Sequence, residues 1–303
     1  MHILVIGGRG TLGNALCNKL LELGHVVTII DILGEDYIRD ELGKTPIKLE
    51  QVGFKNTDLE PYLNASRFMK RSIPELVIDV AEDLMIDRSY HESSFNTNIT
   101  GTAHVLRTCA IYGIRCLLCT WKFRPPSNTS PLATSLYMRS KLTSFYNKGR
   151  AATQRVFIPH IINLDTPGSN FGSVLTRAYN ALLNGGSSLL FEDGEYTHVP
   201  FDWISTHDVV DKIIQEGVLH QRSRNDIHID GTLASFKSVI GIMINIMKGC
   251  QSDTPEHILN MLSNSIKNPV QFFEVNEGDA LDVGYIRTII TEEITRINRN
   301  HTT

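Results

Sequence analysis

The first thirteen residues, MHILVIGGRGTLG, place a cluster of glycines directly after a strand-length apolar run. Ile3 to Ile6 form the run, and Gly7, Gly8, Gly10 and Gly13 follow it. Glycine loses more backbone entropy on ordering than any other residue, so a cluster this dense indicates a geometric requirement. The spacing satisfies both G-x-G-x-x-G and G-x-x-G-x-x-G, which are typical of a turn that binds a pyrophosphate. The segment therefore predicts a strand, a phosphate-binding turn and a helix.

The first half of the chain alternates short apolar runs with longer amphipathic segments. Strand-length runs occur at ILVI, HVVTIID, ELVIDVA and IRCLLCT, with helix-like stretches such as TLGNALCNKLLELG and NITGTAHVLRTCAIYG among them. This alternation is typical of a parallel sheet wound by right-handed crossovers. We expect an α/β protein with a Rossmann-type doubly wound parallel sheet in residues 1–165, which bind the cofactor.

The chain changes character after RVFIPHIINL, which reads as one more strand. The following segment, TPGSNFGSVLTRAYNALLNGG, is rich in glycine and turn formers, and shorter alternating segments and small helices come after it. We expect residues 166–303 to form a smaller substrate-binding lobe, interleaved with the last strands of the first domain.

Asp31 supplies the second part of the dinucleotide fingerprint. It ends the second apolar run, 18 residues after Gly13. The amide-rich start of the first helix, at Thr11 and Leu12, would point at the pyrophosphate. Asp31 would accept hydrogen bonds from the ribose hydroxyls and repel a 2'-phosphate, so the sequence predicts NAD rather than NADP. The alternative for Asp31 is an ordinary aspartate at a strand end.

Tyr137 and Lys141, in SLYMRSKL, form the pattern Y-x-x-x-K. Four residues apart, they share one face if the segment is helical. A phenol normally ionises near pH 10, and nearby positive charge favours its ionised form. Such a tyrosine can exchange a proton with a substrate alcohol while hydride passes to or from a nicotinamide.

The glycine turn and this pair together resemble the extended short-chain dehydrogenase/reductase family, and within it the NAD-dependent sugar-nucleotide epimerase/dehydratase group. The resemblance runs along nearly the whole chain and implies a catalytic triad of Thr120, Tyr137 and Lys141. The cofactor-binding residues that it implies, with those of the turn, are Gly7, Gly10, Thr11, Leu12, Gly13, Asp31, Asp58, Leu59, Ala81, Asn98, Tyr137 and Lys141.

The resemblance also implies substrate contacts from Thr120 and Asn163, and two departures alter the substrate site. Trp121 and Lys122 follow Thr120, where the dehydratases carry an Asp-Glu pair, so water elimination lacks its usual carboxylates. Trp121 has two readings, a ring that stacks on the substrate or a cap on the core.

Two arginines that hold the nucleotide diphosphate in that group are replaced by Phe201 and Asn276. A replacement cation could come from Arg155, Arg177 or Lys212. We expect Arg177 to be the replacement cation, because the segment SVLTRAYNALL is typical of a helix, which would border the substrate cleft.

The expected activity is oxidation and reduction of a secondary alcohol on a sugar or nucleotide sugar. The leading hypothesis is C4 epimerisation through a 4-keto intermediate. A 4-keto-sugar reductase is one alternative, and a non-catalytic NAD-binding sensor or scaffold is another. The resembled family also implies a homodimer that packs through TGTAHVLRTCAIYG and YMRSKLTSFYNK.

Composition narrows the partners and the compartment. A formal net charge of −4 provides no basic field for nucleic acid. The longest apolar stretches fall far short of the roughly 18 residues that a membrane span needs. The five cysteines form no disulfide framework, and no histidine pair has zinc-ligand spacing, so we expect a cytoplasmic protein without a metal. Cys116 and Cys119, in a C-x-x-C spacing, are expected to be buried core residues.

Overall fold

A computed structural model describes residues 1–31, 50–53, 59–68, 73–82, 95–121, 131–146, 153–164, 175–176, 179, 200–219, 226–250 and 283–300. Contacts divide the chain into two compact units. The first contains Met1–Ile158 and His207–Ile229, and the second contains Pro159–Thr206 and Asp230–Thr303. The division into domains 1–165 and 166–303, which the sequence predicts, is not tested by these contact-based units and stays a prediction.

The first unit is built on a seven-stranded sheet in the order β3-β2-β1-β4-β5-β6-β9. All neighbouring strands run parallel. The strands are β1 (His2–Ile6), β2 (Val26–Asp31), β3 (Glu50–Gly53), β4 (Leu76–Asp79), β5 (Arg115–Trp121), β6 (Thr153–Ile158) and β9 (Ile227–His228). The order reverses between β1 and β4, where such sheets bind their ligands. The predicted α/β class with a Rossmann-type parallel sheet is confirmed.

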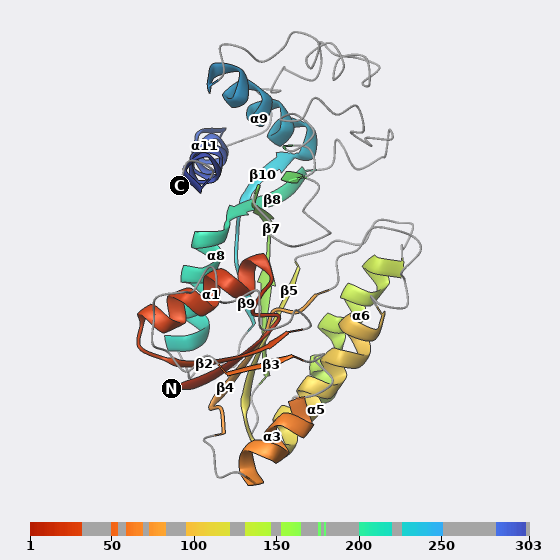
Figure 1. The fold of residues 1–303 in the computed structure, drawn as a ribbon. Helices are drawn as coiled ribbons and strands as arrows, with labels where there is room; N and C mark the ends of the chain where they lie inside the picture. The colour runs from red at the N-terminus through yellow and green to blue at the C-terminus, as the bar shows by residue number, and fades with distance from the viewer. Residues whose placement is uncertain are drawn as a thin grey trace. The chain divides into compact units, whose positions relative to one another are not determined.

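Helices cover both faces of this sheet (Figure 1). On one face lie α3 (Leu59–Phe68), α5 (Thr102–Tyr112) and α6 (Pro131–Tyr146). On the other lie α1 (Thr11–Glu22) and α8 (Thr206–Lys212). Two π-helical segments adjoin them, η4 (Asn96–Gly101) before α5 and η5 (Ile213–Leu219) after α8.

The central strand β1 is apolar on both sides because both sides are covered. Leu4 and Ile6 pack into a cluster that contains Val105 of α5. Ile3 and Val5 point to the opposite face and are completely buried. A continuous apolar run, rather than an alternating one, is what a doubly covered parallel strand requires.

The second unit contains a three-stranded sheet in the order β10-β8-β7. Its elements are β7 (His160–Ile162), β8 (Pro200–Ser205), β10 (Thr232–Ser235), α9 (Phe236–Cys250) and α11 (Val283–Asn300). Its core joins Trp203 of β8 to Met243 of α9 and Ile290 of α11. The two helices therefore pack through apolar faces into one cluster with the sheet.

The expectation of a single strand over RVFIPHIINL is wrong. β6 ends at Ile158 and β7 begins at His160, and the two strands belong to different sheets. Pro159 separates them, and proline has no N–H to donate to a strand ladder. The interruption coincides with the passage from the first unit to the second.

Two other expectations concern cysteine and the membrane. Cys116 and Cys119 are buried on β5, as predicted. Burial raises the pKa of the Cys119 thiol far above its ordinary value, so the thiol stays neutral. Within the described ranges, no helix is both long and apolar enough to cross a membrane.

Candidate cofactor and catalytic site

In the turn after β1, the backbone at residue 7 has a conformation and surroundings that suit only glycine. Its φ of +80° lies in the left-handed region, and a Cβ there would lie 2.8 Å from the Cα of Ala81. Its N–H donates to the carbonyl of Ile30 at 2.8 Å. Gly7 therefore turns the chain at the carboxyl ends of β1, β2 and β4, at the point where the strand order reverses.

Gly13 and Gly10 serve the same turn in different ways. A Cβ on Gly13 would lie 2.0 Å from the carbonyl oxygen of Gly7, so α1 approaches the turn too closely for any side chain. Gly10 precedes α1, and no side chain caps the helix there. The uncapped N–H groups at the positive end of a helix suit an anion, so the turn fits a pyrophosphate.

Asp31 ends β2 beside this turn and is 8% exposed. Its Oδ2 accepts the backbone N–H of Arg9 at 2.9 Å. The carboxylate is thus attached to the phosphate-binding turn itself. A carboxylate at this place suits the hydroxyls of a ribose better than a second phosphate.

Tyr137 and Lys141 lie on the same exposed face of α6. The Lys141 Nζ is 5.1 Å from the centroid of the Tyr137 ring. Tyr137 is 50% exposed, while Thr120 on β5 is 1% exposed. The three residues predicted as a triad thus come from one strand end and one helix of the same unit.

Arg139, which the sequence reasoning missed, joins that helix to the strand ends. Its side chain is completely buried, and its Nη2 donates to the carbonyl oxygen of Cys119 at 3.2 Å. It also pairs with Asp79 and Glu82. A signal existed in the sequence, because helical geometry turns residue 139 away from the face shared by Tyr137 and Lys141.

The other predicted cofactor residues that the structure describes in the first unit lie around the same sheet edge. Leu59 is completely buried at the start of α3, and Ala81 follows β4 next to Gly7. Asn98 of η4 is also buried, and its Nδ2 donates to the Ser135 hydroxyl of α6 at 3.0 Å. Thr11 and Leu12 begin α1 and are partly buried.

The substrate residues predicted from the sequence are divided between the units. Trp121 ends β5 in the first unit and is partly buried. Asn163 follows β7 in the second unit, where its carbonyl oxygen accepts a hydrogen bond from Thr176. Asp58 and Arg177 lie outside the described residues.

Two of the candidate replacement cations are engaged elsewhere. The Arg155 guanidinium pairs with the Asp226 carboxylate, with Nε 3.0 Å from Oδ1, and also donates to the carbonyl of Ser140. Lys212 on α8 lies 3.8 Å from Glu216. Arg155 in particular is fixed as a link between β6 and the residue before β9.

A seven-stranded parallel sheet with a glycine turn at its switch point defines a dinucleotide-binding α/β protein. Residues 3–216 match the model of the NAD dependent epimerase/dehydratase family, and the chain belongs to this family. It is therefore an enzyme of an NAD-dependent family. NAD is its cofactor, as the sequence predicts.

Individual proteins of known function are similar at lower identity. The UDP-glucose 4-epimerase of Mycolicibacterium smegmatis is 25% identical over 236 residues, 72% of this chain and 73% of the relative. The crystal structure of the Thermotoga maritima UDP-glucose 4-epimerase with UDP-glucose has a TM-score of 0.63 and 19% identity, covering 82% of this chain and 83% of that one. MoeE5 in complex with UDP-glucuronic acid and NAD has a TM-score of 0.64 and 15% identity over the same shares. These structures share the fold.

Proposed function

We propose that the chain epimerises a nucleotide sugar at C4 through a 4-keto intermediate. The placement of Tyr137 and Lys141 on α6, in the unit that carries the glycine turn, supports this proposal. The family match and the similarity to UDP-glucose 4-epimerases support the substrate class.

Each residue of the site has a distinct task in this proposal. The bound NAD supplies a reversible hydride acceptor. The Tyr137 phenolate takes the proton of the C4 hydroxyl as the alcohol is oxidised, and the phenol so formed returns the proton as the ketone is reduced. Thr120 holds the C4 oxygen by a hydrogen bond. The Lys141 ammonium, beside the Tyr137 ring, contacts the cofactor ribose.

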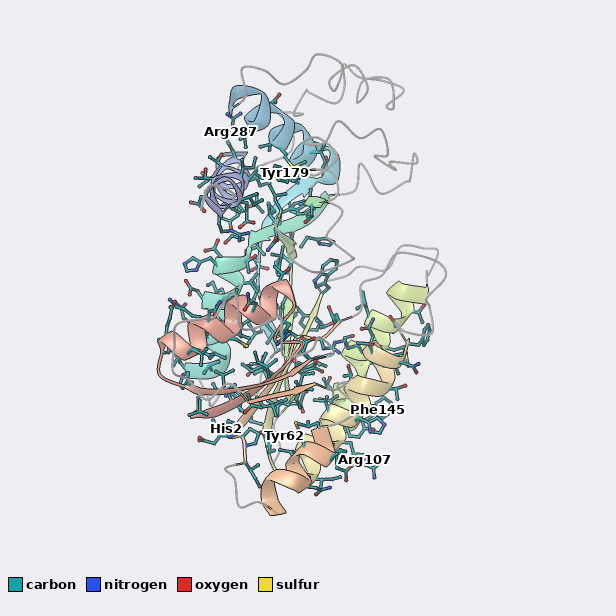
Figure 2. The ribbon with its side chains drawn as sticks, in the orientation of Figure 1. His2, Tyr62, Arg107, Phe145, Tyr179 and Arg287 are labelled. Atoms are coloured by element: carbon teal, nitrogen blue, oxygen red, sulfur yellow. The ribbon has the colours of Figure 1, made fainter. Side chains whose placement is uncertain are left out.

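The substrate contacts and the cellular setting belong to the same proposal. Asn163, Trp121 and Arg177 are assigned to the sugar nucleotide, and a cytoplasmic location is assigned to the protein. We also include a homodimer. The outer faces of α5 and α6 expose large apolar side chains, with Ile111 59% and Phe145 70% exposed. Figure 2 shows Phe145 on the outer side of this helical layer, away from the sheet.

Incubation of the NAD-loaded protein with UDP-glucose tests the reaction. An epimerase produces UDP-galactose with no net change in the absorbance of reduced cofactor. A 4-keto-sugar reductase instead consumes reduced cofactor stoichiometrically with a keto sugar. A protein that binds NAD, yet turns over no sugar in a panel of UDP-, dTDP-, GDP- and CDP-sugars, is the sensor or scaffold of the remaining alternative.

A further inference from the structure

Arg139 is a charged residue of α6 whose side chain has no exposed surface. It lies midway between Tyr137 and Lys141, whose side chains are on the exposed face of the helix. Burying a guanidinium removes its hydration, so its N–H groups need acceptors within the protein. The positions of those acceptors therefore indicate which parts of the structure Arg139 joins.

The backbone acceptors of Arg139 lie where the ladder between β4 and β5 ends. Asp79 and Leu118 are the last residues in register between these two strands. One residue further along β5, the Cys119 carbonyl accepts from the Arg139 Nη2 at 3.2 Å, and the same nitrogen donates to the Asp79 carbonyl at 3.4 Å. The guanidinium thus joins the two strands beyond their last pair, directly before Thr120.

Side chains from two further directions hold the same guanidinium. Its Nη2 lies 3.3 Å from the Asp79 Oδ1, and its Nε lies 3.2 Å from the Glu82 Oε1. Its Nη1 donates to the hydroxyl of Thr102, at the start of α5. Arg139 therefore joins α6 to the end of β4, to the end of β5 and to α5.

The Asp79 carboxylate extends these contacts to the glycine turn. Its Oδ1 also accepts the backbone N–H of Ala81 at 3.1 Å. Ala81 lies against Gly7, where an added Cβ would lie 2.8 Å from the Ala81 Cα. A continuous series of contacts thus runs from Arg139 through Asp79 and Ala81 to the turn that the cofactor requires.

We propose that Arg139 is a positioning residue, which holds the Tyr137 turn of α6 in one place relative to Thr120 and to the glycine turn. The guanidinium suits this task because its planar fork directs several N–H groups to fixed acceptors, whereas a lysine ammonium is a compact point charge. A displacement of about 1 Å can lower a rate about a hundredfold, so the loss of the fork affects catalysis more than binding. This inference rests on the proposed roles of Tyr137 and Thr120.

Two variants separate the position of the helix from the charge of the cluster. Arg139→Lys keeps a positive charge beside the carboxylates and loses the fork. A triple variant, with Arg139→Met, Asp79→Asn and Glu82→Gln, removes the three charges together, because removing the arginine alone leaves two buried carboxylates unpaired. The asparagine oxygen can still accept the Ala81 N–H, so the glycine turn keeps this support.

Arg115→Met is the matched control. Arg115 begins β5, at the opposite end of the strand from Thr120, and is partly buried. Its Nη2 donates to the Gln154 side chain and to the carbonyl of Gly217. This variant therefore loses the side-chain hydrogen bonds of an arginine on β5 without touching the site, and we expect its kcat to stay within twofold of the wild type.

Steady-state kinetics with UDP-glucose give the first result, with kcat expressed per NAD site titrated in the same sample. We expect kcat to fall at least tenfold in Arg139→Lys and in the triple variant. The KM and the dissociation constant for NAD should change less than threefold. A wild-type kcat in either variant overturns the proposal, because the fork is then unnecessary. A tenfold loss in Arg115→Met also overturns it, because the effect is then general to β5.

Hydrogen exchange of the NAD-loaded protein, followed by mass spectrometry, tests the anchoring without a substrate. The amides of α6 should exchange at least tenfold faster in Arg139→Lys and in the triple variant, while those of α3 keep the wild-type rate. Arg115→Met should leave α6 unchanged. Unchanged exchange in α6 of the Arg139 variants overturns the proposal, whatever the kinetics show.

The remaining outcomes are also decisive. If one of the two Arg139 variants does not fold, the other gives the result. If neither folds, Arg139 is required for folding itself, and the positioning role is overturned. A wild type that turns over no sugar refutes the proposed function instead, and the exchange of α6 then still decides whether Arg139 holds this helix.

Discussion

The helical spacing of Tyr137 and Lys141 brings their two functional groups close together. Their four-residue separation puts both side chains on the exposed face of α6, with the ammonium 5.1 Å from the ring centroid. The same geometry turns Arg139, midway between them, into the interior. A single helical turn thus carries the proposed acid/base tyrosine, the lysine assigned to the cofactor, and the buried cation that fixes the helix to the strand ends.

Tyr137→Phe removes the proposed proton acceptor and leaves the ring in place. We expect kcat with UDP-glucose to fall at least about a hundredfold, the lower end of what general acid/base catalysis contributes. The dissociation constant for NAD, measured by calorimetry, should change less than about threefold, because the cofactor keeps its other contacts. Tyr146→Phe, on the last turn of α6, is the control and retains activity. An active Tyr137→Phe enzyme contradicts the assignment.

Asp31→Asn tests the choice of cofactor. The amide oxygen of asparagine can still accept the Arg9 N–H, so the turn keeps its shape while the negative charge is lost. We expect the wild type to prefer NAD over NADP, and the variant to lose at least about tenfold of that preference, which corresponds to about 1.4 kcal/mol. Titration of both cofactors gives the two ratios. Equal wild-type affinities for the two cofactors show that Asp31 does not discriminate between them.

The residues that sequence reasoning found and missed differ in how local their signal is. The glycine turn and the tyrosine–lysine pair are short patterns whose spacing implies a geometry, so each could be read from a few positions. Glu82 and Arg139 are 57 positions apart, and their contact depends on how β4 and α6 pack. A charged residue in an apolar run hints at burial, but its partner follows only from the tertiary structure.

At the scale of elements, Gly10 and Gly13 have different structural roles in the glycine turn, although the motif treats them alike. Gly13 is required by the packing of α1 on the turn, since a Cβ there would lie 2.0 Å from the Gly7 oxygen. A Cβ on Gly10 would lie 3.5 Å from the same oxygen, which is an ordinary contact. Gly10 is therefore open to a side chain in the protein alone, and its constraint comes from the ligand.

Paired alanine substitutions separate these tasks. Gly13→Ala should lower the midpoint of thermal unfolding sharply in the absence of NAD, because α1 must move away from β1. Gly10→Ala should unfold near the wild-type temperature without NAD, yet gain less stability when NAD is added. Thermal shift with and without cofactor measures both effects. A Gly10→Ala protein with a full NAD-induced shift contradicts the close approach of the phosphate to this residue.

The outer faces of α5 and α6 carry the proposed homodimer contact. Phe145→Glu replaces a large apolar side chain that is 70% exposed by a charged one, so we expect the protein to shift from dimer to monomer. Light scattering coupled to size-exclusion chromatography measures the mass directly. Leu219→Glu, at an exposed position on η5, is the control and leaves the mass unchanged. A wild-type protein that is monomeric at micromolar concentration removes this part of the proposal.

At the scale of the whole molecule, the sequence was most informative where a pattern repeats. Apolar runs alternating with helices predicted the parallel sheet of the first unit, because the period of the pattern is set by the layers that cover it. The second unit has fewer and shorter strands, and Pro159 ended a strand that apolarity alone extended. There the pattern was too short to show which sheet each strand joins.

The nucleotide diphosphate of the proposed substrate requires positive charge. Arg155 of the first unit does not supply this charge, because its guanidinium is paired with Asp226. Arg177, in the second unit by sequence position, is the remaining arginine among the three candidates. A charge-assisted hydrogen bond contributes about 1.5 to 3 kcal/mol. We therefore expect Arg177→Ala to raise the KM for UDP-glucose at least about tenfold, which corresponds to about 1.4 kcal/mol. NAD affinity should stay unchanged, because the glycine turn and Asp31 belong to the first unit.

Arg287→Ala, an exposed arginine on α11, controls for the loss of a charge from the second unit (Figure 2). Steady-state kinetics and NAD titration on the three proteins give the comparison. If Arg177→Ala binds UDP-glucose normally, another group holds the diphosphate. If the wild type also binds no diphosphate sugar in the panel, the substrate lacks the diphosphate, and the absence of the two arginines at Phe201 and Asn276 follows directly from that chemistry.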